Sequence, residues 1–186
     1  CCVVKVKMTN AASVTVTSGI KFADAINYKG NPVSLYLDVY QPAGDTSTNR
    51  PVIMWIHGGG FRTGSSRAQG YIVTYATDFA KRGYVCMSID YRLRDGADMP
   101  TQESELPAEQ DAAHDANTAL AWIRTNAATY KINTNWMFFA GGSAGGRIGC
   151  VLSYHEGPDT NVCASCTSAG PSGVPYTDWN RNGVIA

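Results

Sequence analysis

The chain has 186 residues, 44% of them hydrophobic, and its 15 basic and 15 acidic residues give a formal net charge of +0. This length and composition predict a folded globule with one core rather than a disordered chain. Balanced charge without a basic block argues against a nucleic-acid partner, and strand-sized apolar runs argue against a membrane span.

The predicted elements alternate between strands and helices. Two half-polar strands come first, at 13–17 and 33–40, and are expected at an edge of the sheet. Apolar runs and helical patterns then follow in this order: strand 52–56, helix 68–82, strand 84–89, helix 107–129, strand 136–140, helix 144–155 and strand 162–169. Pro107 is expected in the first turn of its helix. The alternation predicts an α/β fold whose mostly parallel sheet of about six strands carries helices on both faces.

The chain is predicted to be a single domain over residues 1–186, with residues 1–12 open to interpretation as an N-terminal extension. It begins with Cys1 rather than Met, which implies a removed leader or a fragment, and a leading cysteine is the lipid-bearing residue of bacterial lipoproteins. Charged residues make up 16% of the chain, against about 25% in typical soluble domains. This composition favours a secreted, periplasmic or lipid-anchored protein over a cytoplasmic one.

No metal site is expected from the six cysteines. Cys163 and Cys166 have C-x-x-C spacing but lie on a predicted strand, where residues three apart point to opposite faces. No second Cys/His pair follows at the spacing of a zinc site.

A glycine-flanked serine occurs where a predicted buried strand ends and a helix begins. The motif is Gly-Gly-Ser-Ala-Gly at 141–145, and this context is typical of a nucleophile elbow. The strained turn would lift the Ser143 hydroxyl above the sheet, and side chains at Gly141 or Gly145 would collide as strand and helix pass closely. The alternative is a nucleotide-phosphate loop, but Ser143 replaces the second glycine of the dinucleotide pattern, and no Gly-Lys-Ser/Thr follows.

A second glycine motif, His-Gly-Gly-Gly-Phe at 57–61, directly follows the predicted buried strand 52–56. Consecutive glycines allow backbone N–H groups to approach a developing oxyanion without obstruction by side chains. Because both glycine motifs follow buried strands, both loops are expected at the same edge of a parallel sheet.

The motifs together resemble a known family. Trp-Ile-His-Gly-Gly-Gly-Phe at 55–61, Asp-Tyr-Arg-Leu at 90–93 and Gly-Ser-Ala-Gly-Gly at 142–146 resemble carboxylesterases of the hormone-sensitive-lipase and type-B branches of the α/β-hydrolase superfamily. Leu-Asp-Val-Tyr-Gln-Pro at 37–42 is similar to bacterial esterases, including some that remove acetyl or feruloyl groups from plant polysaccharides. Gly142 departs from the Asp or Glu that commonly precedes the serine in these branches.

The resemblance implies a role for each matching residue. Ser143 would be the nucleophile of an acyl-enzyme mechanism, and the N–H groups of Gly59, Gly60 and Ala144 would form the oxyanion hole. His57, with Gly58, would hold the glycine loop and would not be the general base. No metal or organic cofactor is implied.

The acid and the histidine of a catalytic triad are missing from the expected places. In this superfamily they follow the serine along the chain. His155 would lie roughly 18 Å from Ser143 along a helix, Asp178 is interpreted as a loop residue, and His114 and its neighbouring aspartates as surface or structural groups. The chain is therefore expected to be truncated at its C-terminus and inactive alone.

The leading hypothesis is a serine hydrolase of carboxylic esters, acting on short-chain small molecules or on acetyl and feruloyl esters linked to carbohydrate. Two alternatives stay open. One is a peptidase of the prolyl-oligopeptidase type, and the other is a non-catalytic relative that uses the fold for binding.

Overall fold

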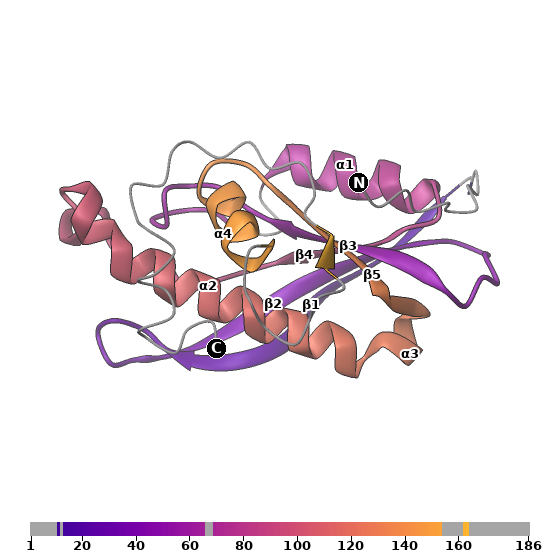
Figure 1. Ribbon diagram of the computed structural model, residues 1–186, viewed down its shortest axis with the longest axis horizontal. Helices are drawn as coiled ribbons and strands as arrows, with labels where there is room; N and C mark the ends of the chain where they lie inside the picture. Colours follow the sequence, from indigo (N-terminus) through magenta and orange to yellow (C-terminus); the bar gives the residue numbers. More distant parts are fainter. Residues whose placement is uncertain (1–10, 12, 66–68, 154–161, 164–186) are drawn as a thin grey trace.

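A sheet with helices on both faces organises the chain (Figure 1). The computed structural model describes residues 11, 13–65, 69–153 and 162–163. Its strands are β1 (Val14–Ile26), β2 (Pro32–Pro42), β3 (Arg50–Ile56), β4 (Val85–Ile89), β5 (Ile132–Gly141) and β6 (Val162–Cys163). Its helices are α1 (Gly70–Lys81), α2 (Gln102–Thr125), α3 (Ala127–Tyr130) and α4 (Ala144–Ser153), with a short 3-10 turn η1 (Gly96–Asp98) before α2.

The six strands lie in the order β1-β2-β4-β3-β5-β6. The strands β4, β3, β5 and β6 are parallel, as predicted from their alternation with helices. The pairs β1–β2 and β2–β4 are antiparallel. A tight turn at 27–31, in which the Asn27 amide donates to the Asn31 carbonyl at 2.8 Å, joins β1 to β2, and so short a connection permits only antiparallel pairing.

The central strand β3 is buried on both faces, and its side chains separate two layers of the core. Val52, Met54 and Ile56 pack towards α2 and α4. Ile53 and Trp55 pack towards α1, which covers the opposite face. This two-sided burial explains why the strand is a continuous apolar run rather than an alternating one.

The long helix α2 begins earlier than its sequence predicts. The predicted start at Pro107 is wrong: α2 starts at Gln102, and Pro107 lies inside it. A capping box sets this boundary, since the Ser104 amide donates to the Thr101 hydroxyl at 3.3 Å and the Thr101 amide donates to the Ser104 hydroxyl at 3.0 Å. These bonds satisfy amide donors that a helix terminus otherwise leaves unpaired.

The other predicted elements are found, with shifted ends. β1 and β5 are longer than predicted, and the C-terminal part of the predicted helix 107–129 is the separate helix α3. Predicted helix residues 154–155 and strand residues 164–169 lie outside the described residues.

The end of β3 and the start of α4 approach each other at backbone distance. A Cβ atom on Gly145 would overlap the carbonyl oxygen of Ile56, and a Cβ atom on Gly141 would lie 2.5 Å from the same oxygen. Both glycines are therefore required by close packing, as the sequence predicts.

Replacing Thr101 by Ala should lower the free energy of unfolding by about 1 kcal/mol, because α2 loses its N-cap. Urea denaturation measures this change. Thr118→Ala is the matched control, since Thr118 lies within α2 and its hydroxyl bonds only the preceding turn, at the His114 carbonyl. Equal effects of the two substitutions would contradict the assignment of the cap.

Gly145→Ala should destabilise the fold by about 3 kcal/mol or more, because the added methyl group meets the Ile56 carbonyl. Gly70→Ala is the control. Gly70 has open space around its Cβ position, and the change should leave stability unchanged or raise it by up to about 1 kcal/mol. Thermal unfolding of both variants measures the difference, and a stable Gly145→Ala protein would contradict the close approach.

Candidate active site

The two glycine motifs lie side by side because their strands pair. β3 and β5 are parallel, with Ile56 opposite Gly141, so both chains leave the sheet at the same edge. A Cβ atom on Gly58 would lie 2.8 Å from the Gly142 carbonyl oxygen and 3.4 Å from the Ser143 Cβ. The loops are thus in contact, and the turn at Gly142 and Ser143 leaves no room for a side chain at Gly58.

Ser143 occupies a strained turn between β5 and α4. Its φ of 56° lies in the left-handed region, which a non-glycine residue adopts at a cost in free energy. Two hydrogen bonds close the turn: the Gly145 amide donates to the Gly142 carbonyl at 3.1 Å, and the Arg147 amide donates to the Ser143 carbonyl at 3.0 Å. Ser143 itself is exposed, whereas Ala144 and Gly145 behind it are buried.

The loop after β3 is a tight turn that leaves amides available. Gly59 and Gly60 have φ values of 121° and 60°, and the amides of Arg62 and Thr63 both donate to the Gly59 carbonyl. Among the residues that the structure describes, the amides of Gly59, Gly60 and Ala144 donate to no other group. Free amides at a helix start and a glycine turn are the groups that can bind an oxyanion.

His57 is buried beneath the glycine loop. The residue is only 1% exposed, and its Nδ1 lies 2.7 Å from the Gly58 carbonyl oxygen. The imidazole stacks on the Tyr91 ring at 4.1 Å, and the Tyr91 hydroxyl donates to the His57 carbonyl at 2.9 Å. Burial lowers the pKa of His57, more than the Gly58 carbonyl and Asp90 raise it. A neutral ring donating from Nδ1 fits these contacts.

The start of α1 contributes two residues that sequence reasoning missed. The Gln69 side chain clamps the Gly58 peptide, accepting from its amide at 3.2 Å and donating to its carbonyl at 3.0 Å. A Cβ atom on Gly142 would lie 3.4 Å from the Tyr71 hydroxyl. No sequence pattern marks either side chain, whereas Tyr91 belongs to the Asp-Tyr-Arg-Leu motif at 90–93.

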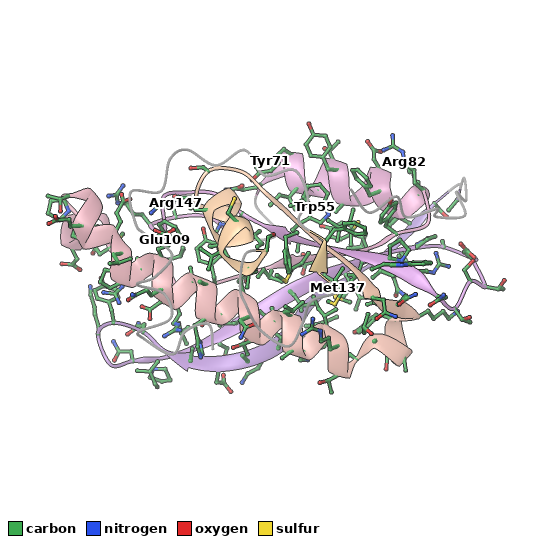
Figure 2. All side chains as sticks on the ribbon, in the orientation of Figure 1. Trp55, Tyr71, Arg82, Glu109, Met137 and Arg147 are labelled. Carbon is green, nitrogen blue, oxygen red and sulfur yellow. The ribbon has the colours of Figure 1, made fainter. Side chains whose placement is uncertain are left out.

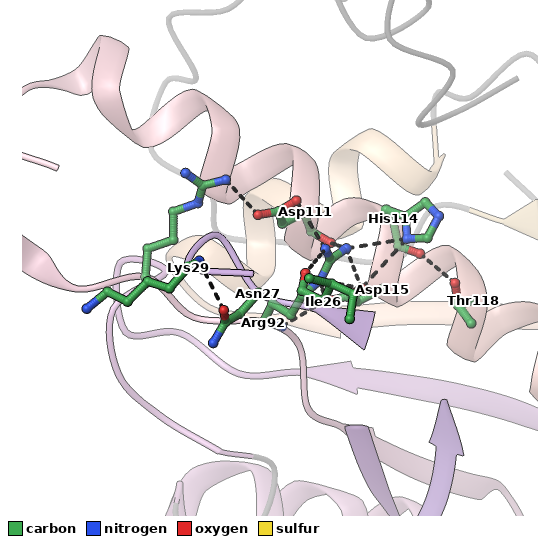
Figure 3. A network of polar contacts seen from close by, with 9 residues as sticks. Ile26, Asn27, Lys29, Arg92, Asp111, His114, Asp115 and Thr118 are labelled. Carbon is green, nitrogen blue, oxygen red and sulfur yellow. Dashed lines mark hydrogen bonds and ion pairs between the residues drawn. The ribbon is translucent and has the colours of Figure 1, made fainter. Parts of the chain in front are cut away.

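A charged cluster anchors the loop after β4 to α2 (Figure 3). Asp115 is almost fully buried, and it accepts from the Arg92 amide at 2.8 Å and from Arg92 Nε at 2.9 Å. Asp111 also pairs with Arg92, at 3.3 Å. His114 lies at the exposed edge of this cluster, 3.7 Å from Asp115. These contacts fit the surface or structural role expected of Asp111, His114 and Asp115.

The same cluster reaches the glycine loop through Arg94. Its side chain donates to Asp111 at 2.7 Å, and its amide donates to the Phe61 carbonyl at 2.9 Å. The Asp111 carboxylate therefore holds the loop after β4 against the end of the second glycine motif.

A cleft of about 560 Å³ opens beside this loop. It is lined by the β1–β2 turn at 27–29, by Arg62 and Thr63, and by residues 93–96. Arg62 connects the cleft to the glycine loop, since its Nη1 lies 3.5 Å from the Cβ position of Gly60.

Within the described part of the chain, no group of three or more His, Cys, Asp or Glu residues could hold a metal ion. None of its helices is both long and apolar enough to span a bilayer. Cys1, His155, Cys166 and Asp178 lie outside the described residues.

Comparisons with known proteins identify the family of the chain. Residues 37–169 match the model of the BD-FAE family. The chain is 31% identical over 150 residues to Esterase LipC of Mycobacterium tuberculosis, covering 74% of this chain and 34% of that protein. It is 32% identical over 159 residues to human bile salt-activated lipase, covering 81% of this chain and 20% of the lipase. The chain thus spans about a third of the first relative and a fifth of the second.

Solved structures share the fold as well. Thermogutta terrifontis esterase 2, in a form phosphorylated by paraoxon, superposes with a TM-score of 0.56 at 27% identity, covering 76% of this chain and 48% of that chain. The family match covers well over half of the sequence, and the sheet, the helices and the two glycine turns occur in the predicted order. The chain therefore belongs to the BD-FAE family and has the α/β-hydrolase fold.

Proposed function

We propose that this chain carries the nucleophile and the oxyanion hole of a carboxylesterase-type serine hydrolase. One observation carries the proposal: Ser143 stands exposed on a left-handed turn, in contact with the glycine loop that follows β3. The esterase and lipase relatives support ester hydrolysis over peptide hydrolysis.

Hydrolysis proceeds in two steps through an acyl-enzyme. Ser143 Oγ attacks the ester carbonyl carbon, and the carbonyl oxygen becomes an oxyanion that accepts from the amides of Gly59, Gly60 and Ala144. The tetrahedral intermediate expels the alcohol, which takes up the proton released by the serine. Water then attacks the acyl group by the same route and frees Ser143. The N-terminus of α4 adds the positive end of its dipole at the oxyanion.

The general base of this mechanism is neither of the two described histidines. The His57 ring is enclosed between Tyr91 and the Gly58 carbonyl, and His114 belongs to the Arg92 cluster on α2. We place the base, and the acid that orients it, outside the described residues. In that case His57 has a structural role and keeps the glycine loop in shape.

The cleft beside Arg62 is the place we assign to the polar part of the substrate. Arg62 and Thr63, which directly follow the second glycine motif, form one side of it, and Tyr28 and Asp95 add aromatic and charged groups. An acyl or alcohol portion that carries hydroxyl groups, such as an ester linked to carbohydrate, finds hydrogen-bonding partners there. Short-chain esters need only the site at Ser143.

Replacing Ser143 by Ala in the complete protein should lower kcat/KM for p-nitrophenyl acetate by at least about 10³-fold, because the nucleophile is lost. Ser153→Ala is the matched control, since Ser153 lies at the far end of α4, the helix that follows Ser143, and its hydroxyl donates to the Gly149 carbonyl. A dipeptidyl p-nitroanilide should be cleaved far more slowly than the ester. Undiminished ester hydrolysis by Ser143→Ala would remove Ser143 from the mechanism, and preferred cleavage of the anilide would favour a peptidase.

Replacing His57 by Asn should weaken catalysis while leaving the pH profile of kcat/KM in place. Burial lowers the pKa of His57, so the ring is already neutral at neutral pH and does not supply the ionisation that limits the rate. Rates from pH 5 to 9 would be measured for both proteins. Disappearance of the acid limb in His57→Asn would identify His57 as the base and overturn its structural role.

A further inference from the structure

The side chain of Arg147 on α4 contacts two carboxylates and one aromatic ring (Figure 2). Its Nε donates to Glu109 Oε1 at 3.1 Å while Nη2 pairs with the other oxygen of the same carboxylate. Nη1 donates to Glu105 Oε2 at 3.4 Å. The guanidinium also lies over the Phe61 ring, 5.2 Å from its centroid. Arg147 is thus fixed on two carboxylates of α2 and one aromatic ring.

These contacts join the two glycine motifs. The Arg147 amide donates to the Ser143 carbonyl, so the residue closes the nucleophile turn, while Phe61 ends the motif at 57–61. Glu105 completes a second link, because its Oε1 accepts from Arg62 Nη2 at 2.9 Å, and the Arg62 amide donates to the Gly59 carbonyl. Two routes therefore run from the Ser143 turn to the glycine loop, and both pass through Arg147.

Stability alone does not explain this cluster. Glu109 is completely buried, and burial raises its pKa, although Arg147 opposes the shift. Removing a carboxylate and a guanidinium from water costs free energy that their attraction only partly returns, and apolar residues of similar size often serve as well. A bidentate Arg–carboxylate pair differs from an apolar contact because it fixes both the distance and the orientation of the two side chains. Such precision is needed where two loops must meet at one oxyanion.

We infer that Arg147 is a positioning residue, which sets the glycine loop of 57–61 against Ser143 through Phe61 and Glu105. The inference rests on the proposed function, because the geometry it protects is that of the oxyanion hole. Misplacement of reacting groups by about 1 Å can reduce a rate on the order of 10²-fold. Loss of Arg147 should therefore act on kcat more than on KM.

The test uses the complete protein, p-nitrophenyl acetate, and titration of active sites with paraoxon. Arg147→Met should lower kcat per titrated site on the order of 10²-fold, with KM changed by less than about 3-fold. Arg82→Met is the matched control. Arg82 lies over the Phe79 ring at 5.4 Å, at the other end of α1, and its loss should leave kcat within about 2-fold of wild type.

Two double variants separate positioning from stability. Arg147→Met alone leaves the buried Glu109 carboxylate without its arginine partner. Adding Glu109→Gln removes that charge, so the double variant should regain thermal stability without regaining kcat. Arg147→Met with Phe61→Leu should be no slower than Arg147→Met alone, because the two side chains act through one contact.

Three results would overturn the inference: kcat of Arg147→Met equal to that of Arg82→Met, recovery of kcat together with stability in the Glu109→Gln pair, or losses from Phe61→Leu and Arg147→Met that multiply. Ser143→Ala, assayed in parallel, keeps the two proposals apart. An inactive Ser143→Ala beside a fully active Arg147→Met rejects the positioning role alone, whereas an active Ser143→Ala rejects both.

Discussion

The contact between the end of β3 and the turn after β5 is the constraint on which the rest of the structure depends. Parallel pairing places Ile56 opposite Gly141, and the Ile56 carbonyl oxygen is then enclosed by Gly141 and Gly145. No side chain fits between these backbones. Ser143 lies between these two glycines on a left-handed turn, with its Cβ close to Gly58, so the packing of the sheet and the geometry of the site share one backbone contact.

Polar side chains around this contact hold the loops in place. The His57 imidazole and the Gln69 side-chain amide both lie within hydrogen-bond distance of the Gly58 carbonyl, and the Tyr91 ring stacks on the imidazole. Charged groups on α2 bind the loop after β4 and, through Arg147, the start of α4. Donors that are fixed before a substrate arrives need no reorganisation as charge develops, which is the condition for strong stabilisation of an oxyanion.

Sequence patterns predicted the parts of the fold that depend on local chemistry. Apolar runs located the parallel strands, and Gly141 and Gly145 predicted the close approach of strand and helix that the structure contains. The predicted start of α2 at Pro107 was wrong because the capping box at Thr101 has a stronger effect on the helix boundary than Pro107. The clamps by Gln69 and Arg147 were not predictable, since they join residues 11 and 38 positions apart and depend on tertiary packing.

A crystal structure of the complete protein after reaction with paraoxon, which phosphorylates the related Thermogutta terrifontis esterase 2, would test most directly whether Ser143 and the three amides form one site. A phosphoryl group imitates the tetrahedral intermediate on a serine. We expect a phosphorus atom bonded to Ser143 Oγ, with one phosphoryl oxygen about 3 Å from the amides of Gly59, Gly60 and Ala144. Phosphorylation of another residue, or a phosphoryl oxygen directed away from these amides, would contradict it.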